Sequence, residues 1–149
     1  MNETTVPVVP AIVLRRTYAA PRARVFEAWT TPEIAAKFFG PGEVKATIRE
    51  LNARVGGSYK IEMLLPDGER VIAFGTYREV IPPARLAMSW TWEEDDPAEQ
   101  YETLLTVDFN EVAGGTELVL THANLKTVES RNDHESGWTQ IVDQLAGVL

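Results

Sequence analysis

The chain of 149 residues contains no cysteine and only two histidines, His122 and His134. Without cysteine, a disulfide, a thiolate metal site and a cysteine nucleophile are all excluded. A classical zinc site built on two histidines would need carboxylates as well, and the sequence has no paired-histidine motif. We therefore expect no metal ion and no cofactor.

Positive charge is also scarce: the chain has 14 lysine and arginine residues against 22 aspartate and glutamate residues, a formal net charge of −8. Such a surface repels DNA and anionic lipid on average, and no basic cluster offsets it, so nucleic-acid binding is not expected. No apolar run approaches the roughly 18–20 residues that cross a bilayer, so membrane insertion is not expected either. The first residues carry no basic segment ahead of an apolar stretch, which argues against a signal peptide and makes the cytoplasm the predicted location.

The composition that remains is typical of a globular domain, since 44% of the residues are hydrophobic and 24% are charged. No repeat or linker divides the chain, and its length suits one domain of roughly 100–200 residues. We expect residues 1–10 to form a flexible arm and residues 11–149 to form a single domain.

Alternation of apolar and polar residues predicts a series of β-strands. They are expected over residues 11–18, 44–51, 58–63, 69–80, 86–92, 101–109 and 116–122. Within the fourth of these strands, Ile72 and Phe74 are predicted to share the buried face. Two short helices are expected between the first two strands, beginning near Pro21 and Pro32, because proline suits the first turn of a helix.

The last segment has the periodicity of a helix. Trp138, Ile141 and Leu145 recur at the spacing of one helix face, which predicts a long amphipathic helix. We expect it to begin near Glu129 or Ser130. Hairpin-length connections favour an antiparallel sheet, and one face of that sheet needs the long helix to cover it. The predicted fold class is therefore α+β.

Gly137 lies inside the predicted C-terminal helix. A glycine in a helix interior costs about 1 kcal/mol relative to alanine. We therefore expect a compensating close approach of the helix backbone to another element at this position.

Several short motifs occur in a specific order and spacing. They are Ala20-Pro21, Val25-Phe26-Glu27-Ala28-Trp29, Thr31-Pro32-Glu33, Phe38-Phe39-Gly40-Pro41, Arg54-Val55-Gly56-Gly57, Pro83-Ala84-Arg85-Leu86, Thr121-His122 and Gly137-Trp138. On these motifs the chain resembles the homologues of the activator of the heat-shock protein 90 ATPase. This family is part of the START-like helix-grip superfamily, which includes the birch-pollen allergen and polyketide cyclases. The resemblance implies a curved antiparallel sheet wrapped around a long C-terminal helix, with two short helices after the first strand.

The space between sheet and helix has two interpretations. In the first, it is a cavity that binds a hydrophobic small molecule such as a lipid, a sterol or a polyketide-like aromatic, and the two short helices with the loop 40–42 form its mouth. In the second, methionine and tryptophan side chains fill it as a closed core. The candidate ligand-binding residues are those expected to face this space: Trp29, Phe38, Tyr59, Ile61, Met63, Phe74, Met88, Trp90, Trp92, Tyr101, Leu105, Leu120, His122, Trp138, Ile141 and Leu145.

Few polar residues are candidates for chemistry. His122 is expected to point inward as a hydrogen-bonded structural histidine rather than as a general base. His134 is expected at the start of the last helix or on the surface. Tyr59 and Tyr101 are expected to bring hydroxyl groups to the cavity, where a buried hydroxyl needs a partner. The acidic run 93–96 is expected to be a solvated loop.

The sequence contains no Ser-His-Asp constellation, no phosphate-binding glycine loop and no dinucleotide fingerprint, so no catalytic residue is assigned. Binding of a hydrophobic small molecule is the favoured function, and a non-catalytic role is favoured over an enzyme. One alternative is a polyketide cyclase- or dehydratase-like enzyme that uses the same cavity. The other is a co-chaperone or another protein-interaction module, although nothing in the sequence supports a chaperone partner. A homodimer is compatible with the sequence.

Overall fold

The computed structural model describes residues 8–149. The flexible arm predicted for residues 1–10 therefore lies outside the described residues, except for residues 8–10. In the described range the helices and strands, with η1 and η2 as short 3₁₀ helices, are β1 (Ile12–Tyr18), α1 (Arg22–Thr30), α2 (Pro32–Ala35), β2 (Lys45–Leu51), β3 (Ser58–Leu64), β4 (Arg70–Ile81), β5 (Arg85–Trp92), η1 (Pro97–Glu99), β6 (Thr103–Val112), β7 (Gly115–Ala123), α3 (Val128–Leu145) and η2 (Ala146–Val148).

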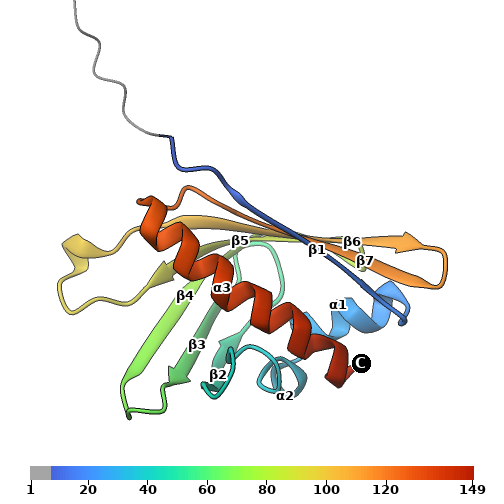
Figure 1. Cartoon of the computed structure of the whole chain (residues 1–149), viewed down its shortest axis with the longest axis horizontal. Helices are drawn as coiled ribbons and strands as arrows, with labels where there is room; N and C mark the ends of the chain where they lie inside the picture. The colour runs from blue at the N-terminus through green and yellow to red at the C-terminus, as the bar shows by residue number, and fades with distance from the viewer. Residues whose placement is uncertain (1–7) are drawn as a thin grey trace, which may run out of the picture.

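The strands of the described range form a seven-stranded antiparallel sheet in the order β1-β7-β6-β5-β4-β3-β2. From β2 to β7 each strand pairs with the next one along the chain, whereas β1 pairs with β7. Figure 1 shows α3 crossing one face of this bent sheet, with α1 and α2 near the C-terminal end of the helix. The predicted α+β helix-grip fold is confirmed.

Proline and threonine mark the starts of the helices. Pro21, with a φ of −65°, precedes α1, and Pro32 is the first residue of α2, so both fit the helix starts at which proline is favoured. The side-chain oxygen of Thr127 accepts a hydrogen bond of 3.0 Å from the backbone N–H of Ser130 and so caps α3. The helix begins at Val128, close to its predicted start.

Aromatic side chains fill the part of the interior next to α1 and α2. The ring of Trp29 packs edge-on against Phe38 and Phe39, with centroid distances of 5.5 and 5.1 Å. It also stacks on Trp138 of α3 at 6.4 Å. All four side chains are at most 4% exposed. Hydrophobic burial and aromatic contacts close this part of the interior, so a cavity has to lie further along α3.

The prediction that Ile72 and Phe74 face the interior is wrong. In the pairing of β4 with β3, Ala73 lies opposite the buried Ile61. Phe74 lies opposite Lys60, and successive side chains of a strand point to opposite faces, so Phe74 is on the outer face of the sheet. Apolar side chains occur on both faces of β4, and alternation alone does not identify the inner one.

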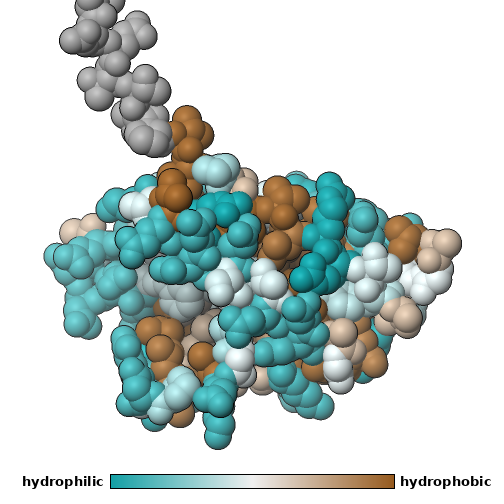
Figure 2. Space-filling model, viewed as in Figure 1, coloured by the Kyte–Doolittle hydropathy of each residue, from teal (hydrophilic) through white to brown (hydrophobic). Residues whose placement is uncertain are grey.

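The surface over α3 is mainly hydrophilic (Figure 2). Hydrophobic side chains emerge beside this helix, in the direction of β3 and β4. In the part of the chain that the structure describes, no helix is both long and apolar enough to cross a membrane.

Candidate functional site

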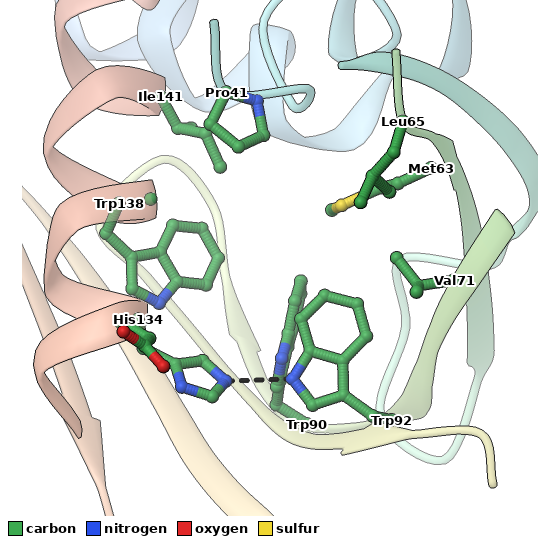
Figure 3. A pocket seen from close by; sticks show the side chains of 11 residues that line it. Pro41, Met63, Leu65, Val71, Trp90, Trp92, His134, Trp138 and Ile141 are labelled. Carbon is green, nitrogen blue, oxygen red and sulfur yellow. Dashed lines mark hydrogen bonds between the residues drawn. The ribbon is translucent and has the colours of Figure 1, made fainter. Parts of the chain in front are cut away.

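A cavity of about 500 Å³ lies between α3 and the strands β3, β4 and β5. Its walls are almost entirely apolar, with the indole rings of Trp90, Trp92 and Trp138 around one end (Figure 3). Its volume falls in the range of about 300–1,000 Å³ that is usual for small-molecule sites. The lining residues are Pro41, Met63, Leu65, Val71, Trp90, Trp92, Asp133, His134, Gly137, Trp138 and Ile141.

Gly137 lies on the part of α3 that borders this cavity. A Cβ atom at this position would have the Cγ atom of Pro41 as its nearest neighbour, at the ordinary van der Waals distance of 4.0 Å. The predicted close approach of the helix backbone to another element at Gly137 is therefore wrong. The missing side chain leaves space in the cavity instead.

Behind the cavity wall, His122 of β7 is fully buried in a hydrogen-bond network. The indole Nε1–H of Trp138 donates to Nδ1 of His122 at 2.9 Å, and Nε2 of His122 lies 2.7 Å from Oγ1 of Thr103. The hydroxyl of Thr103 donates to the backbone oxygen of Trp90 at 2.7 Å, so its oxygen accepts the Nε2–H of His122. Both ring nitrogens of His122 therefore have partners, and Nε2 carries the proton.

This environment keeps His122 neutral. Burial, and to a smaller extent the nearby His134, lowers the pKa of His122 from its usual 6.5 to about 3. A proton added at Nδ1 would also face the N–H of Trp138, which is itself a donor. The prediction of a hydrogen-bonded structural histidine is confirmed.

His134 lies on the cavity wall, so the prediction of a helix-start or surface position is wrong. Its Nε2 accepts a hydrogen bond of 2.8 Å from Nε1–H of Trp92, drawn as the dashed line in Figure 3. Its Nδ1 donates to the backbone oxygen of Ser130 at 2.7 Å. The imidazole thus links α3 to β5, and both of its nitrogens are occupied. The sequence did contain a signal for the inward position of His134. His134 and Trp138 are four residues apart, which places both on one face of the helix.

A smaller cavity of about 190 Å³ shares Trp90, Trp92 and His134 with the first. Tyr101 borders this smaller cavity and not the larger one. Its side chain is 44% exposed, and its ring lies 5.7 Å from Nζ of Lys126. The strand β6 begins at Thr103, so Tyr101 lies outside the strand. The alternation of inward and outward side chains, from which an inward orientation was predicted, therefore does not extend to Tyr101.

The hydroxyl of Tyr59 was expected to reach the cavity, but it forms a hydrogen bond within the sheet instead. It donates a hydrogen bond to the backbone oxygen of Ser89, and burial raises the pKa of the phenol well above its usual value. Tyr59 therefore braces β3 against β5 as a neutral donor. Among residues 8–149, no group of three histidine, aspartate or glutamate side chains is arranged to hold a metal ion.

A family model described as Activator of Hsp90 ATPase homolog 1-like protein matches residues 19–149, which is most of the chain. The chain belongs to this family. The resemblance inferred from the sequence motifs is thereby confirmed. Among proteins with curated descriptions, none matches the chain.

Solved structures of similar proteins have the same fold. A protein from Chromobacterium violaceum is 29% identical, with a TM-score of 0.83 over 93% of this chain and 95% of that one. The AHSA1 protein from Silicibacter pomeroyi is 24% identical, with a TM-score of 0.82 over 93% of this chain and 96% of that one. A protein from Arthrobacter aurescens is 20% identical, with a TM-score of 0.83 over 97% of this chain and 91% of that one.

In this member of the Activator of Hsp90 ATPase homolog 1-like family, the predicted site residues fall into separate groups. Those that border the larger cavity are Met63, Trp90, Trp92, Trp138 and Ile141. Those that are buried away from it are Trp29, Phe38, Tyr59, Ile61, Met88, Leu105, Leu120, His122 and Leu145. Phe74 is on the outer face of the sheet, and Tyr101 borders the smaller cavity.

The loop and turn residues of the cavity wall were only partly anticipated. Pro41 brings the loop 40–42 to the cavity as predicted, whereas Trp29 of α1 and Phe38, which follows α2, pack in the closed core. Leu65 and Val71, on either side of the turn between β3 and β4, were missed. Val71 pairs directly with Met63, so the correct register of this hairpin would have identified it.

Proposed function

We propose that this domain binds a hydrophobic small molecule, such as a lipid, a sterol or a polyketide-like aromatic, in the cavity between its sheet and α3. The observation that carries the proposal is the apolar cavity of about 500 Å³ bordered by three indole rings. Burial of a ligand's apolar surface against such walls is favourable at roughly 25 cal/mol per Å². Gly137 supports the proposal because it keeps side-chain volume out of the cavity.

The polar groups at the cavity favour binding over catalysis. A cyclase- or dehydratase-like enzyme needs polar side chains that converge on the substrate and are free to exchange a proton. His134 borders the cavity, but Trp92 and Ser130 occupy its two ring nitrogens. Asp133 is exposed at the border. These contacts suit an apolar wall held in place by hydrogen bonds.

The proposal is tested by titrating the purified protein with 2-ethylnaphthalene and following tryptophan fluorescence. Three of the four tryptophans border the cavity, so binding is expected to change the emission. Gly137→Leu places an aliphatic side chain in the cavity and is expected to weaken binding by at least about tenfold, or about 1.4 kcal/mol. Native mass spectrometry of the freshly purified protein provides a second readout, as a bound molecule adds its mass.

Gly137→Ala is the matched control. It adds only a methyl group, so binding should change little, while the free energy of unfolding rises by up to about 1 kcal/mol because alanine favours a helix. Urea unfolding of both variants checks that they are folded. Equal affinity of Gly137→Leu and the wild type, or no binding of apolar probes by the wild type, would contradict the proposal.

A further inference from the structure

The hydrogen-bonded pair of Trp92 and His134 stands between the two cavities. Both side chains border the larger cavity of about 500 Å³ and also the smaller one of about 190 Å³. The bond of 2.8 Å from Nε1–H of Trp92 to Nε2 of His134 runs from β5 to α3. Figure 3 shows this bond at the end of the larger cavity that is opposite to Pro41. The pair therefore closes the larger cavity on the side of the smaller one.

Further contacts hold the pair in place. Nδ1 of His134 donates to the backbone oxygen of Ser130 at 2.7 Å, so both nitrogens of the imidazole are fixed. The imidazole also packs edge-on against the buried ring of His122, with a centroid distance of 5.1 Å. The ring of Trp90 packs edge-on against Trp92 at 5.6 Å. Because these contacts would have to be broken together, the pair is a fixed part of the wall rather than a mobile side chain.

The two cavities on either side of the pair differ in chemistry. The walls of the larger cavity are almost entirely apolar, whereas Glu94, Glu99 and Lys126 border the smaller one. Thr127 and Ser130 add hydroxyl groups to the smaller cavity. Polar groups of this kind are stabilised by water, and covering them with an apolar molecule is costly. A closed partition keeps an apolar ligand away from them.

We infer that Trp92 and His134 form a specificity-determining partition that confines the ligand to the larger cavity. This inference rests on the proposed function and narrows its ligand class. The ligand is then a compact apolar ring system, which the larger cavity holds by itself. A long-chain molecule that would have to run past the pair into the smaller cavity is outside this class.

The test measures how strongly binding depends on ligand length, by fluorescence titration with 2-ethylnaphthalene and 2-hexylnaphthalene. His134→Ala removes the imidazole and connects the two cavities, so the hexyl chain can pass beyond the former partition. Each methylene group that becomes buried strengthens binding about fourfold. The preference for the hexyl over the ethyl compound should therefore be at least about tenfold greater in His134→Ala than in the wild type. An unchanged preference in a folded His134→Ala protein overturns the inference.

Two control variants separate the partition from other effects of the substitution. His134→Leu also removes the bond to Trp92 but refills much of the space of the imidazole, so its preference should stay within about threefold of that of the wild type. Leu65→Ala enlarges the larger cavity at a half-buried position away from the pair, and it should likewise keep the preference. A rise in either control as large as that in His134→Ala overturns the inference.

A second measurement uses the wild type alone, in case His134→Ala does not fold. In a ¹⁵N–¹H spectrum, saturation with either probe should move the backbone signal of Gly137, which borders the larger cavity and not the smaller one. The signals of Leu125 and Lys126, which border the smaller cavity and not the larger one, should move much less. Equal shifts of these signals and that of Gly137 with the hexyl compound overturn the inference but leave the proposed function intact. Absence of binding by both probes overturns both.

Discussion

Trp138 of α3 and His122 of β7 are joined by a hydrogen bond of 2.9 Å from the indole Nε1 to the imidazole Nδ1. Trp138 is 2% exposed and His122 is 0% exposed, so water cannot replace either partner. A buried polar group that loses its partner costs about 1–3 kcal/mol. The bond therefore fixes the position of the helix on the sheet at the edge of the cavity.

Stability is expected to fall as the pH is lowered. The folded-state pKa of His122 is about 3, below its unfolded value of 6.5, so the unfolded chain takes up the proton first. The contribution of His122 is complete above pH 6.5 and is lost progressively as the pH falls toward 3. The loss is at most about 1.4 kcal/mol for each pH unit. Urea unfolding between about pH 7 and pH 5 measures it before most carboxylates titrate.

His122→Asn is the control for this pH dependence. Asparagine keeps an acceptor for the N–H of Trp138 but cannot take up a proton in this range. Its free energy of unfolding should therefore depend less on pH than that of the wild type. The same pH dependence in both proteins would show that His122 is not the group responsible.

A matched pair of substitutions at Thr103 separates its hydroxyl from its methyl group. Thr103→Val leaves the Nε2–H of His122 without an acceptor and should lower the free energy of unfolding by about 1–3 kcal/mol. Thr103→Ser keeps the hydroxyl and should cost about 0.8 kcal/mol for the lost methyl group. Chemical denaturation gives both values. A serine variant less stable than the valine variant would contradict the network.

Trp92 and His134 are expected to be energetically coupled. Trp92→Phe and His134→Leu each remove the hydrogen bond of 2.8 Å between them. The double variant should be more stable than the sum of the single effects predicts, by about 0.5–1.5 kcal/mol. A double-mutant cycle in urea measures this coupling, and additive effects would show that the bond contributes nothing.

The positions of Phe74 and Phe38 predict very different costs of substitution. Phe38 is 0% exposed, so Phe38→Ala should lower the free energy of unfolding by about 3–5 kcal/mol. Phe74 lies on the outer face, and Phe74→Thr should cost about 1 kcal/mol or less because threonine suits a half-buried strand. Thermal unfolding compares the two variants. A cost at Phe74 as large as that at Phe38 would place it in the core after all.

The sequence allowed the strands and helices to be predicted well because their signals are local. Alternation located the cleanest strand between Leu86 and Trp92, and the Pro66-Asp67-Gly68 turn separates β3 from β4 as expected. The inward face of β4 was not predictable in the same way. It depends on pairing with Ile61 across the sheet, and both faces of β4 are apolar.

The cavity was predicted less well than the fold. Its general place, between sheet and helix, and its wall of Trp90 and Trp138 followed from periodicity. How far the cavity extends depends on which aromatic side chains pack against one another. Trp29 and Phe38 pack together and do not line the cavity. The partners of His134 come from β5 and from a helix backbone carbonyl, which only the folded chain brings together.

The sheet order has a consequence for how the chain folds. In the described sheet β1 is an edge strand whose partner is β7, with Ile12 opposite His122 and Tyr18 opposite Thr116. Strands β2 to β7 can join one after another as hairpins, but β1 cannot pair until β7 has been synthesised. Pairing over such a long sequence separation is slow. Closure of the first strand onto the sheet is therefore expected to be a late step of folding, completed together with the arrival of the segment that carries His122.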